Sequence, residues 1–527
     1  MESRSQFSRD RQLERLTSDA GIWDLVVIGG GATGVGIAVD AATRNYRVAL
    51  FEQHDFGKGT SSRSTKLVHG GVRYLEQGNI SLVREALHER GRLCRNAPHL
   101  VHPLPTIVPL HSQWERFYYG LGLKVYDLLS GRLRLGPSRH LSLAETLAEI
   151  PTLDTTGLCG GVRYFDGAFD DARLLVNLVQ TAIESGAVCL NYAPVRGLVK
   201  ESGRVAGIIA QDAESGKVLR IRARVVVNAT GPFSDQVRRL DDPQAAAAIV
   251  PSQGIHLVFD RAFMPGDTAL VVPKTRDGRV VFAIPWHEHA IVGTTDTPLT
   301  EVSLEPRPLP SEIEFLLETI TPYWTRKPRP ADIRSIFAGI RPLVRSGDAR
   351  NTAKLARDHV IRVSSSGLVS IMGGKWTTYR RMAEDCVHRA AEVGGLLPTP
   401  CRTKTLPIHG AQGESLPGVL AGYGSDGPAI EQLASSRPEL SKPLADRLPY
   451  LAAQVVWSAR HEMARSVEDI LTRRVRALFL DADAAVAAAP KVAELLAGEL
   501  GRDAAWQADQ LQQFEAVAEN YRYHTSD

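Results

Sequence analysis

The chain has 527 residues, which is too many for one compact hydrophobic core and predicts two or three domains. Its formal net charge of only +3 gives no electrostatic support for nucleic-acid binding. Five widely separated cysteines without a CxxC pair argue against a disulfide framework and a structural zinc site. We find no stretch of the roughly 18 to 20 apolar residues that a spanning helix needs, and the charged first residues lack a signal-peptide core.

The first informative segment is an apolar strand that runs into a glycine-rich turn. Residues 25–28 are followed by Gly29, Gly31 and Gly34 at the GxGxxG spacing, and a helix-forming segment begins at once. These glycines permit a tight turn, a close approach to a pyrophosphate, and close packing of helix on strand. A second apolar strand ends in Glu52, whose carboxylate can bind both ribose hydroxyls. The pattern predicts a dinucleotide site but leaves FAD and NAD open.

Beyond this unit, helical and strand patterns alternate along the chain. Helical spacing over residues 79–98 and 171–185 is joined by strand patterns, an order that belongs to a doubly wound sheet. Residues 103–151, rich in turns, aromatic and basic residues, interrupt this domain. Short β-like runs over residues 250–340 predict an antiparallel sheet in a second domain. After Cys401 the sequence is mainly helical, which predicts a separate carboxy-terminal domain.

Two further glycine turns follow apolar strands downstream. The turn 228–231, Asn-Ala-Thr-Gly, is either an ordinary strand end or part of the nucleotide site. The segment 367–380 repeats the design of a strand, two glycines and a helix entry. Amides at such a helix start can stabilise negative charge on a reduced flavin ring. Three turns converging on one elongated ligand favour FAD over NAD.

Several of these segments together resemble one family, the FAD-dependent glycerol-3-phosphate dehydrogenases. This family is the aerobic, respiratory-type branch of the D-amino-acid-oxidase-like flavoproteins. The resemblance is carried by the serine-rich segment 58–76, the turn 228–231, and the motifs at 338–343 and 373–380. Residues 469–474, Asp-Ile-Leu-Thr-Arg-Arg, are similar to the family's carboxy-terminal cap.

The resemblance implies a mixed α/β (α+β) fold with three domains. We expect a Rossmann-like FAD-binding domain from residues 20–100, 160–250 and 340–398. An antiparallel-sheet substrate domain would comprise residues 101–159 and 251–339, and a helical carboxy-terminal domain residues 399–527.

The resemblance also implies a set of residues that contact FAD, which we expect to be bound non-covalently. They are Gly29, Gly31, Ala32, Thr33, Gly34, Glu52, Thr60, Ser61, Ser62, Ser64, Thr65, Lys66, Val195, Ala229, Thr230, Gly231, Gly374, Lys375, Thr377 and Thr378. His69 is expected to line the cofactor loop without a covalent tether.

A substrate with a phosphate dianion needs fixed cations, and arginine suits this because its planar fork makes two parallel hydrogen bonds. Carried over by motif, the family's substrate residues are Arg73 with its neighbour Tyr74, Arg341 and Lys375, and Arg357 is a further candidate. Each cation could instead be solvated or salt-bridged. The prediction is that glycerol 3-phosphate is held by this group.

His256 matches the position of the family's active-site histidine. A neutral imidazole can take the proton of the C2 hydroxyl while hydride leaves C2 for the flavin N5. A lone histidine in a strand is more often simply packed, and Arg341 or Lys375 could also stabilise the developing alkoxide. The catalytic residues predicted here are therefore His256, Arg341 and Lys375.

The implied reaction is oxidation of sn-glycerol 3-phosphate to dihydroxyacetone phosphate, with electrons passed to a membrane quinone. The alternatives are an oxidase that produces hydrogen peroxide, another alcohol or amine oxidation on the same fold, and a catalytically inactive flavin-binding module. A peroxide assay would separate the oxidase, whereas indifference to the phosphate group would mark the other oxidation and absence of flavin bleaching the inactive module.

Residues 114–129 mix aromatic, leucine and basic residues over about four helical turns, a pattern of helices that lie in a membrane interface. The alternative is an amphipathic helix packed on the protein's own core. Because no calcium-binding loop of the EF-hand type is visible, a bacterial-type enzyme is the better match. We expect a cytoplasmic protein, peripherally associated with the inner (cell) membrane and possibly homodimeric.

Overall fold

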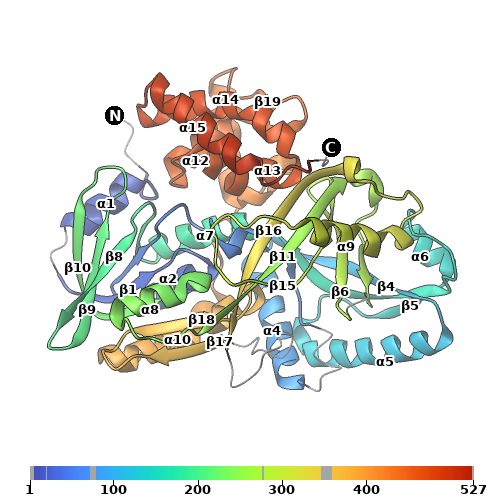
Figure 1. The fold of residues 1–527 in the computed structure, drawn as a ribbon, viewed down its shortest axis with the longest axis horizontal. Coiled ribbons are helices and arrows are strands. Elements are labelled where there is room, and N and C mark those ends of the chain that lie inside the picture. The colour runs from blue at the N-terminus through green and yellow to red at the C-terminus, as the bar shows by residue number, and fades with distance from the viewer. Residues whose placement is uncertain are drawn as a thin grey trace.

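The computed structural model describes residues 5–18, 21–71, 79–273, 275, 278–345 and 359–524. Two large sheets lie side by side, and the carboxy-terminal helices cover one end of both (Figure 1). The predicted α/β fold class with a helical carboxy-terminal region is confirmed. The division into three domains with the stated limits stays a prediction.

The eight-stranded sheet has the order β17-β18-β10-β1-β2-β7, with β8 and β9 joined to β10. Its central strands are parallel and buried, as the continuous apolar runs in the sequence predict. The strands are β1 (Trp23–Ile28), β2 (Val48–Phe51), β7 (Val188–Leu190), β8 (Val195–Glu201), β9 (Arg204–Gln211), β10 (Val218–Asn228), β17 (His359–Val363) and β18 (Val369–Gly373).

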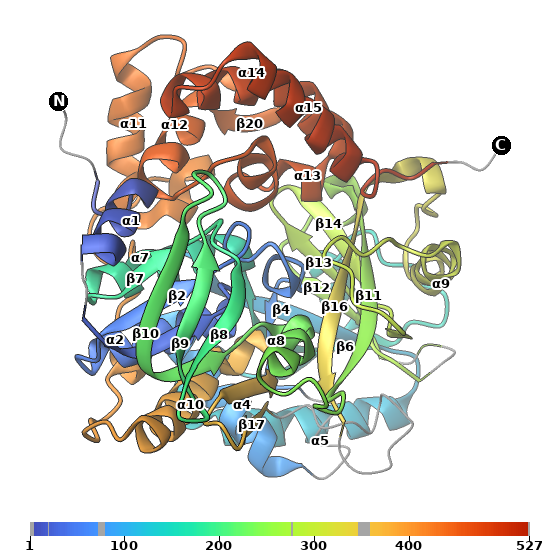
Figure 2. The ribbon, with the colours of Figure 1, turned by 60° about the vertical axis from the view of Figure 1, so that its left-hand side comes forward.

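Alternate residues of β1 enter two different cores. Leu25 and Val27 pack under the helices α2 (Ala32–Thr43), α7 (Asp171–Glu184) and α10 (Tyr379–Gly394). Val26 and Ile28 pack on the other face. That second face is covered by α1 (Arg9–Ser18) and the β8–β10 hairpin strands rather than by a layer of long helices. Figure 2 shows β8, β9 and β10 in front of β2.

The ten-stranded sheet has the order β15-β11-β14-β13-β12-β4-β6-β3, with β16 paired to β11 and β5 to β6. Its strand pairs within the described residues are antiparallel except β12 with β4, which run parallel. The strands are β3 (Leu67–Val68), β4 (Val101–Leu110), β5 (Arg139–Leu141), β6 (Gly160–Phe169), β11 (Ile249–Asp260), β12 (Ala269–Val272), β13 (Val281–Trp286), β14 (His289–Gly293), β15 (Thr297–Pro298) and β16 (Ile333–Val344).

Two of these strands, β3 and β6, fall in ranges that the sequence assigned to the nucleotide domain. The physical reason is pairing, because β6 is in register with β4 from Phe169 back to Gly160. The chain crosses between the sheets at Asp170, which is the N-cap of α7. The chain therefore passes from the ten-stranded sheet through α7 to β7 of the eight-stranded sheet.

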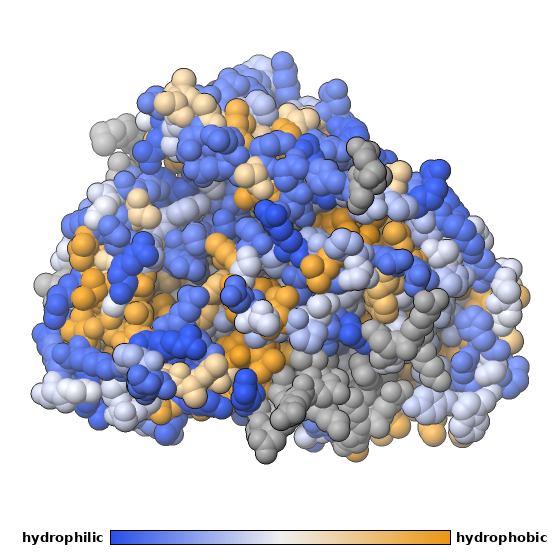
Figure 3. Space-filling view, viewed as in Figure 1, coloured by the Kyte–Doolittle hydropathy of each residue, from blue (hydrophilic) through white to orange (hydrophobic). Residues whose placement is uncertain are grey.

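The carboxy-terminal region contains α11 (Gly427–Ser436), α12 (Ala452–His461), α13 (Ala477–Leu480), α14 (Ala482–Leu500) and α15 (Ala504–Ala518), with a small hairpin of β19 (Pro443–Ala445) and β20 (Leu448–Leu451). These helices share one apolar core, to which α14 contributes its buried alanines. Asp481 caps the start of α14 and Gly501 ends it in a left-handed conformation. Figure 3 shows mostly hydrophilic residues over these helices.

The remaining long helices border the ten-stranded sheet. They are α4 (Ile80–Asn96), α5 (Gln113–Ser130), α6 (Leu143–Glu149) and α9 (Pro310–Ile320), and α8 (Ser234–Asp241) follows β10. In Figures 1 and 2, α5 lies along the edge of the molecule opposite the carboxy-terminal helices. Within the described ranges, no helix combines the length and apolarity required to cross a bilayer.

Candidate active site

The first glycine turn brings three pieces of backbone into close contact. A Cβ atom at Gly29, where φ is +110°, would lie 2.7 Å from the carbonyl oxygen of Ala229, and one at Gly34 would lie 1.9 Å from the Gly29 oxygen. Only glycine fits either position. The N-cap of α2 is Gly31, which offers no capping side chain, so the helix start presents backbone amides. This cradle fits the pyrophosphate of a dinucleotide.

Glu52 follows β2 directly beside this turn. Its carboxylate accepts hydrogen bonds from the Gly30 amide at 2.7 Å and the His54 amide at 2.9 Å. Burial raises the pKa of Glu52, although both hydrogen bonds oppose that shift. Ala193, two residues before Val195, donates its amide to the Glu52 carbonyl at 2.8 Å. Glu52 is thus held beside the glycine turn, and the contact of Val195 with FAD stays a prediction.

The loop of residues 58–66, called the serine loop below, connects the glycine turns. Ser61 accepts the Ala32 amide of α2 on its Oγ at 2.9 Å and the indole N–H of Trp376 on its carbonyl at 2.8 Å. Thr60 donates its hydroxyl to the Ile340 carbonyl at 2.7 Å. The structure therefore brings together the first and third predicted segments and β16 around one loop.

The second and third glycine turns are adjacent because β10 pairs with β18. Asn228 holds the second turn, accepting the hydroxyl of Thr230 at 2.7 Å and donating to the Ser234 carbonyl at 3.0 Å. In the third, Thr377 accepts the amide of His69 on its Oγ at 3.2 Å. The backbone of His69 is thereby tied to the third turn.

His256 lies in β11 between β14 and β16 and is only 2% exposed. Its ring stacks on Phe337 with a centroid distance of 4.6 Å, and its Nε2 is 2.9 Å from the hydroxyl of Thr65. Burial, together with the charges of Lys66 and Arg341, lowers the pKa of His256 well below its usual value. The imidazole is therefore neutral at pH 7 and can accept a proton.

Arg341 extends from β16 toward the same place. Its guanidinium donates to the Thr294 hydroxyl at 3.1 Å and the Thr295 carbonyl at 3.0 Å, and it lies 3.4 Å from Asp296. The side chain stays one-third exposed, so part of the fork faces outward. Lys375 is the N-cap of the short helix η8 (Trp376–Thr378) and is half-buried. Of the predicted substrate residues, Arg73, Tyr74 and Arg357 lie outside the described residues.

The predicted contact of Lys66 with FAD stays a prediction, and the structure places the Lys66 side chain inside the protein. The side chain has no accessible surface, and its Nζ donates to Asp171 at 2.7 Å and to the Ser62 carbonyl at 2.8 Å. Burial lowers the pKa of Lys66 to about 7, against the attraction of Asp171. A side chain that is wholly enclosed offers no surface to a cofactor, so the geometry favours a role in holding the loop.

Two residues that were not predicted from the sequence, Asp171 and Arg476, complete this arrangement. Asp171 accepts the amide and hydroxyl of Ser64 at 3.0 and 2.7 Å, and Arg476 donates to Asp171 at 3.0 Å and to the Ser62 carbonyl at 2.9 Å. Arg476 comes from the carboxy-terminal region, just beyond the predicted cap motif. An acidic residue at a helix start gave the only local signal for Asp171.

The cap motif itself forms a buried ionic network, called the arginine cluster below. It consists of Asp55, Glu468, Asp469, Arg473 and Arg474, and the last four lie in or beside the π-helix η11 (Asp469–Arg474). Arg474 binds both oxygens of Asp55 at 2.8 and 2.9 Å, and Arg473 adds a bond of 2.6 Å. Burial alone would raise the pKa of Asp55, but the two arginines hold it at about 2.

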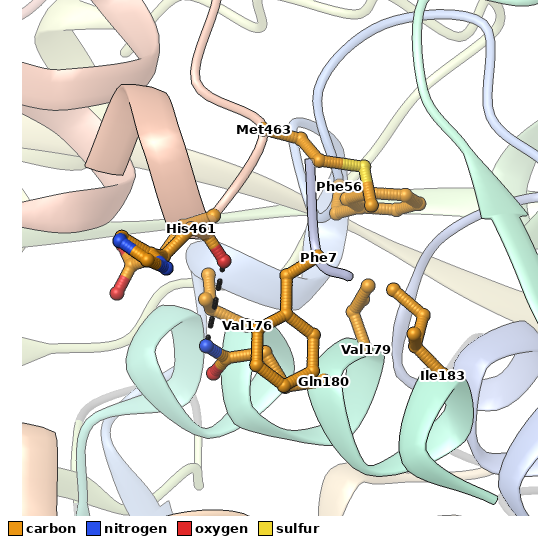
Figure 4. A pocket seen from close by; sticks show the side chains of 9 residues that line it. Phe7, Phe56, Val176, Val179, Gln180, Ile183, His461 and Met463 are labelled. Carbon is orange, nitrogen blue, oxygen red and sulfur yellow. Dashed lines mark hydrogen bonds between the residues drawn. The ribbon is translucent and has the colours of Figure 1, made fainter. Parts of the chain in front are cut away.

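Two small cavities lie away from this site. An apolar one, lined by Phe7, Phe56, Val176, Met463 and neighbouring residues, has a volume of only about 10 Å³ (Figure 4). A second, of about 250 Å³, is lined by residues of α4 and the segment after α5, including Arg95, Arg132 and Arg134. Neither includes a predicted site residue in its lining.

Two family models match the chain. The model described as FAD dependent oxidoreductase matches residues 24–380, and that of the C-terminal domain of alpha-glycerophosphate oxidase matches residues 369–507. Because the first match covers more than half of the chain, the fold and the glycine cradle together define an FAD-dependent oxidoreductase.

Individual relatives narrow this class. The mitochondrial glycerol-3-phosphate dehydrogenase of Arabidopsis thaliana is 41% identical over 544 residues, covering 95% of this chain and 86% of the relative. The human mitochondrial enzyme is 39% identical over 541 residues, covering 96% and 74%. The solved glycerol-3-phosphate dehydrogenase from Bacillus halodurans, complexed with FAD, has a TM-score of 0.76 and 27% identity, covering 99% of this chain and 100% of that one. The chain belongs to the glycerol-3-phosphate dehydrogenase family of FAD-dependent oxidoreductases, and the predicted family is confirmed.

Proposed function

We propose that this protein oxidises sn-glycerol 3-phosphate to dihydroxyacetone phosphate with FAD bound non-covalently, and passes the electrons to a membrane quinone. The observation that carries the proposal is a neutral, buried imidazole next to a partly exposed guanidinium, beside a glycine cradle that fits a dinucleotide. A base that is unprotonated at pH 7 suits alcohol oxidation, and a fixed cation suits an anionic substrate.

In this proposal each part of the site has one task. The start of α2 and the turns at Gly29 and Gly231 hold the dinucleotide, and Glu52 binds its ribose. FAD bound there supplies the two-electron acceptor for the hydrogen at C2. Arg341 and Lys375 orient the anionic substrate and stabilise negative charge on its oxygen, and His256 is the final acceptor of the hydroxyl proton.

The proposed quinone acceptor lies in the bilayer, and α5 is the element that suits contact with it. Gly120, Leu123 and Tyr126 form the buried face of α5. The opposite face is apolar too, and consists of Trp114, Phe117, Tyr118, Leu121, Val125 and Leu128. Leu128 is 80% exposed and Trp114 71%. Because soluble surfaces rarely show such a continuous stripe, we assign it to a membrane interface.

Anaerobic titration of the purified yellow protein tests the reaction. Glycerol 3-phosphate should bleach the flavin absorbance, whereas glycerol and lactate at the same concentration should not. Equal bleaching by all three would contradict the role of the cations. In air, rapid peroxide formation with glycerol 3-phosphate and no reduction of a soluble quinone analogue would support the oxidase alternative instead. A protein that binds FAD but is not bleached would be the inactive module.

Sedimentation with lipid vesicles tests the α5 assignment. Replacing Phe117, Leu121 and Leu128 by serine should release the protein from vesicles that bind the wild type, with little change in stability since all three are exposed. The matched control replaces Val218, Leu240 and Leu397, which are exposed apolar residues on other elements. Unchanged vesicle binding by the α5 variant, or equal loss in the control, would contradict the assignment.

A further inference from the structure

His256 is packed so closely that a substrate has no direct route to its ring. Phe337 covers one face, and a Cβ atom at Gly293 would lie 2.1 Å from the His256 Cδ2. The Nε2 atom faces the Thr65 hydroxyl at 2.9 Å, and Nδ1 is buried with no hydrogen-bond partner among the described residues. With 2% of the residue exposed, neither ring nitrogen reaches an open surface.

The side chain of Thr65 is accessible, whereas the ring of His256 is not. Thr65 is partly exposed, whereas its neighbour Lys66 is fully enclosed. Among the described residues, the Thr65 hydroxyl is the one polar group within hydrogen-bond distance of the His256 Nε2. A threonine hydroxyl has one hydrogen to donate and two lone pairs that accept. It can therefore donate to an unprotonated imidazole and accept from a second hydroxyl at the same time.

We propose that Thr65 is a catalytic residue that relays the proton of the substrate's C2 hydroxyl to His256. The inference rests on the proposed function, since it takes His256 as the final proton acceptor. The substrate O–H bond breaks and its proton moves to the Thr65 Oγ1. In the same step the proton of Thr65 moves to the His256 Nε2, which becomes imidazolium. FAD bound beside the substrate would accept the C2 hydrogen with its electron pair, so that the carbonyl forms with charge and electrons balanced.

The residues on both sides of Thr65 are fixed in a way that suits this task. Ser64 gives its amide and hydroxyl to Asp171, and Lys66 gives its ammonium group to the same carboxylate. Lys66 has a φ of +64°, and its amide donates to the Ser64 Oγ at 3.1 Å. Arg476 holds Asp171 from the other side. Because its neighbours share one anchor, the Thr65 hydroxyl is held toward His256 before substrate binds.

Two substitutions separate a relay from a packing role. Thr65→Val keeps the shape but removes the hydroxyl, and Thr65→Ser keeps the hydroxyl but removes a methyl group. In anaerobic stopped-flow experiments with glycerol 3-phosphate, we expect flavin reduction to slow by about 10²-fold or more in Thr65→Val. Thr65→Ser should stay within roughly fivefold of wild type. The matched control is Thr106→Val, whose flavin should be reduced at the wild-type rate. Thr106 is a buried residue of β4, in the same ten-stranded sheet as His256.

Bound FAD and the unfolding midpoint are measured for each variant. These values show whether a slower reduction comes from impaired folding or from the loss of the hydroxyl. A second measurement needs no variant. In mixtures of H₂O and D₂O, the relay predicts a bowed dependence of the wild-type reduction rate on deuterium content, because two protons move together. A direct transfer predicts a straight line.

The outcomes distinguish this inference from the function on which it rests. A Thr65→Val rate within threefold of wild type, equal losses in the valine and serine variants, or a linear deuterium dependence would overturn the relay alone. A wild-type flavin that glycerol 3-phosphate does not reduce would overturn the proposed function and the relay with it. A large loss in valine, retention in serine and a bowed dependence would support both.

Discussion

The serine loop lies between two buried polar sites that differ in how their polar groups are paired. On one side, the arginine cluster sets two guanidinium groups against three carboxylates, and Asp55 alone meets both arginines. On the other side, the histidine pocket of Thr65, His256, Phe337 and Arg341 contains a neutral ring. One of that ring's nitrogens is unpaired within the described residues.

This contrast shows how the two sites divide their tasks. Charges that are all paired in a low-dielectric interior hold one geometry, because any displacement leaves an ion without a partner. An underpaired group is costly to bury but can change its protonation state, which a structural ion pair rarely does. The arginine cluster is therefore expected to control stability, and the histidine pocket to control rate.

The largest loss of stability is expected from Asp55→Asn. An amide cannot neutralise Arg473 and Arg474, so two buried cations lose their shared partner, and breaking such a network typically costs about 3 to 5 kcal/mol. Denaturant unfolding measures it. Glu201→Gln is the control, because its pair with Arg222 is about half-exposed and should contribute less than about 1 kcal/mol. Equal effects in both variants would contradict the structural role of the cluster.

The reverse pattern is expected from His256→Asn. Flavin reduction by glycerol 3-phosphate should slow by about 10²- to 10⁴-fold while bound FAD is retained. Since the pKa of His256 lies well below its usual value, the wild-type reduction rate should not fall between pH 8 and pH 6. An imidazole with an ordinary pKa would become protonated over that interval. A decline in rate that tracks a group near pH 6.5 would contradict a His256 that is unprotonated before the reaction at both pH values.

The sequence located the turns that we expect to hold the dinucleotide, and their contacts with FAD stay predictions. The glycine turns and Glu52 could be located because each follows an apolar strand, and strand-to-turn patterns are local. His256, Arg341 and Lys375 came from motifs of the resembling family, and the first two lie close enough for Arg341 to lower the histidine pKa. Arg73, Tyr74 and Arg357 stay predictions.

The rest depends on contacts that no local pattern contains. Asp171 and Arg476 are 305 residues apart, and Asp55 and Arg474 are 419 apart, so only the folded chain reveals the pairs. Lys66 was assigned to the cofactor because it sits in the serine motif, yet its side chain turns inward to Asp171. Likewise, the strand β6 pairs in the larger sheet through its register with β4, which sequence periodicity does not specify.

His409 joins α7 to the carboxy-terminal region through two ion pairs, and raising the pH removes its positive charge. It lies between Glu184 of α7 and Asp426 of the carboxy-terminal region, at 2.7 and 3.0 Å. Burial opposes its charge, but the hydrogen bonds to Asp426 and Glu184 raise the pKa to about 9. Because the pKa of His409 is higher in the folded protein, the protonated ring contributes its full stabilisation below the unfolded pKa near 6.5. This contribution is lost as the pH rises through 9.

Wild-type stability should therefore fall by up to about 3 kcal/mol between pH 6 and pH 9.5 through this group. His409→Gln should remove that component, so its unfolding free energy would change less over the same interval. Parallel pH profiles for the two proteins would show that His409 does not titrate as described. The arginine cluster offers no such dependence in this range, because its cations stay charged.

Tyr192→Phe should produce the smallest loss of stability. It tests whether the arginine cluster tolerates the loss of one hydrogen-bond donor. The tyrosine hydroxyl lies 2.8 Å from both oxygens of Asp469, which also binds Arg473 and the backbone amides of Arg465 and Ser466. Losing one of these donors should cost about 1.5 kcal/mol, the lower range for a hydrogen bond to a charged group. Denaturant unfolding beside Asp55→Asn checks the ratio. If Tyr192→Phe were as damaging as Asp55→Asn, the cluster would depend on every donor rather than on its central ion pairs.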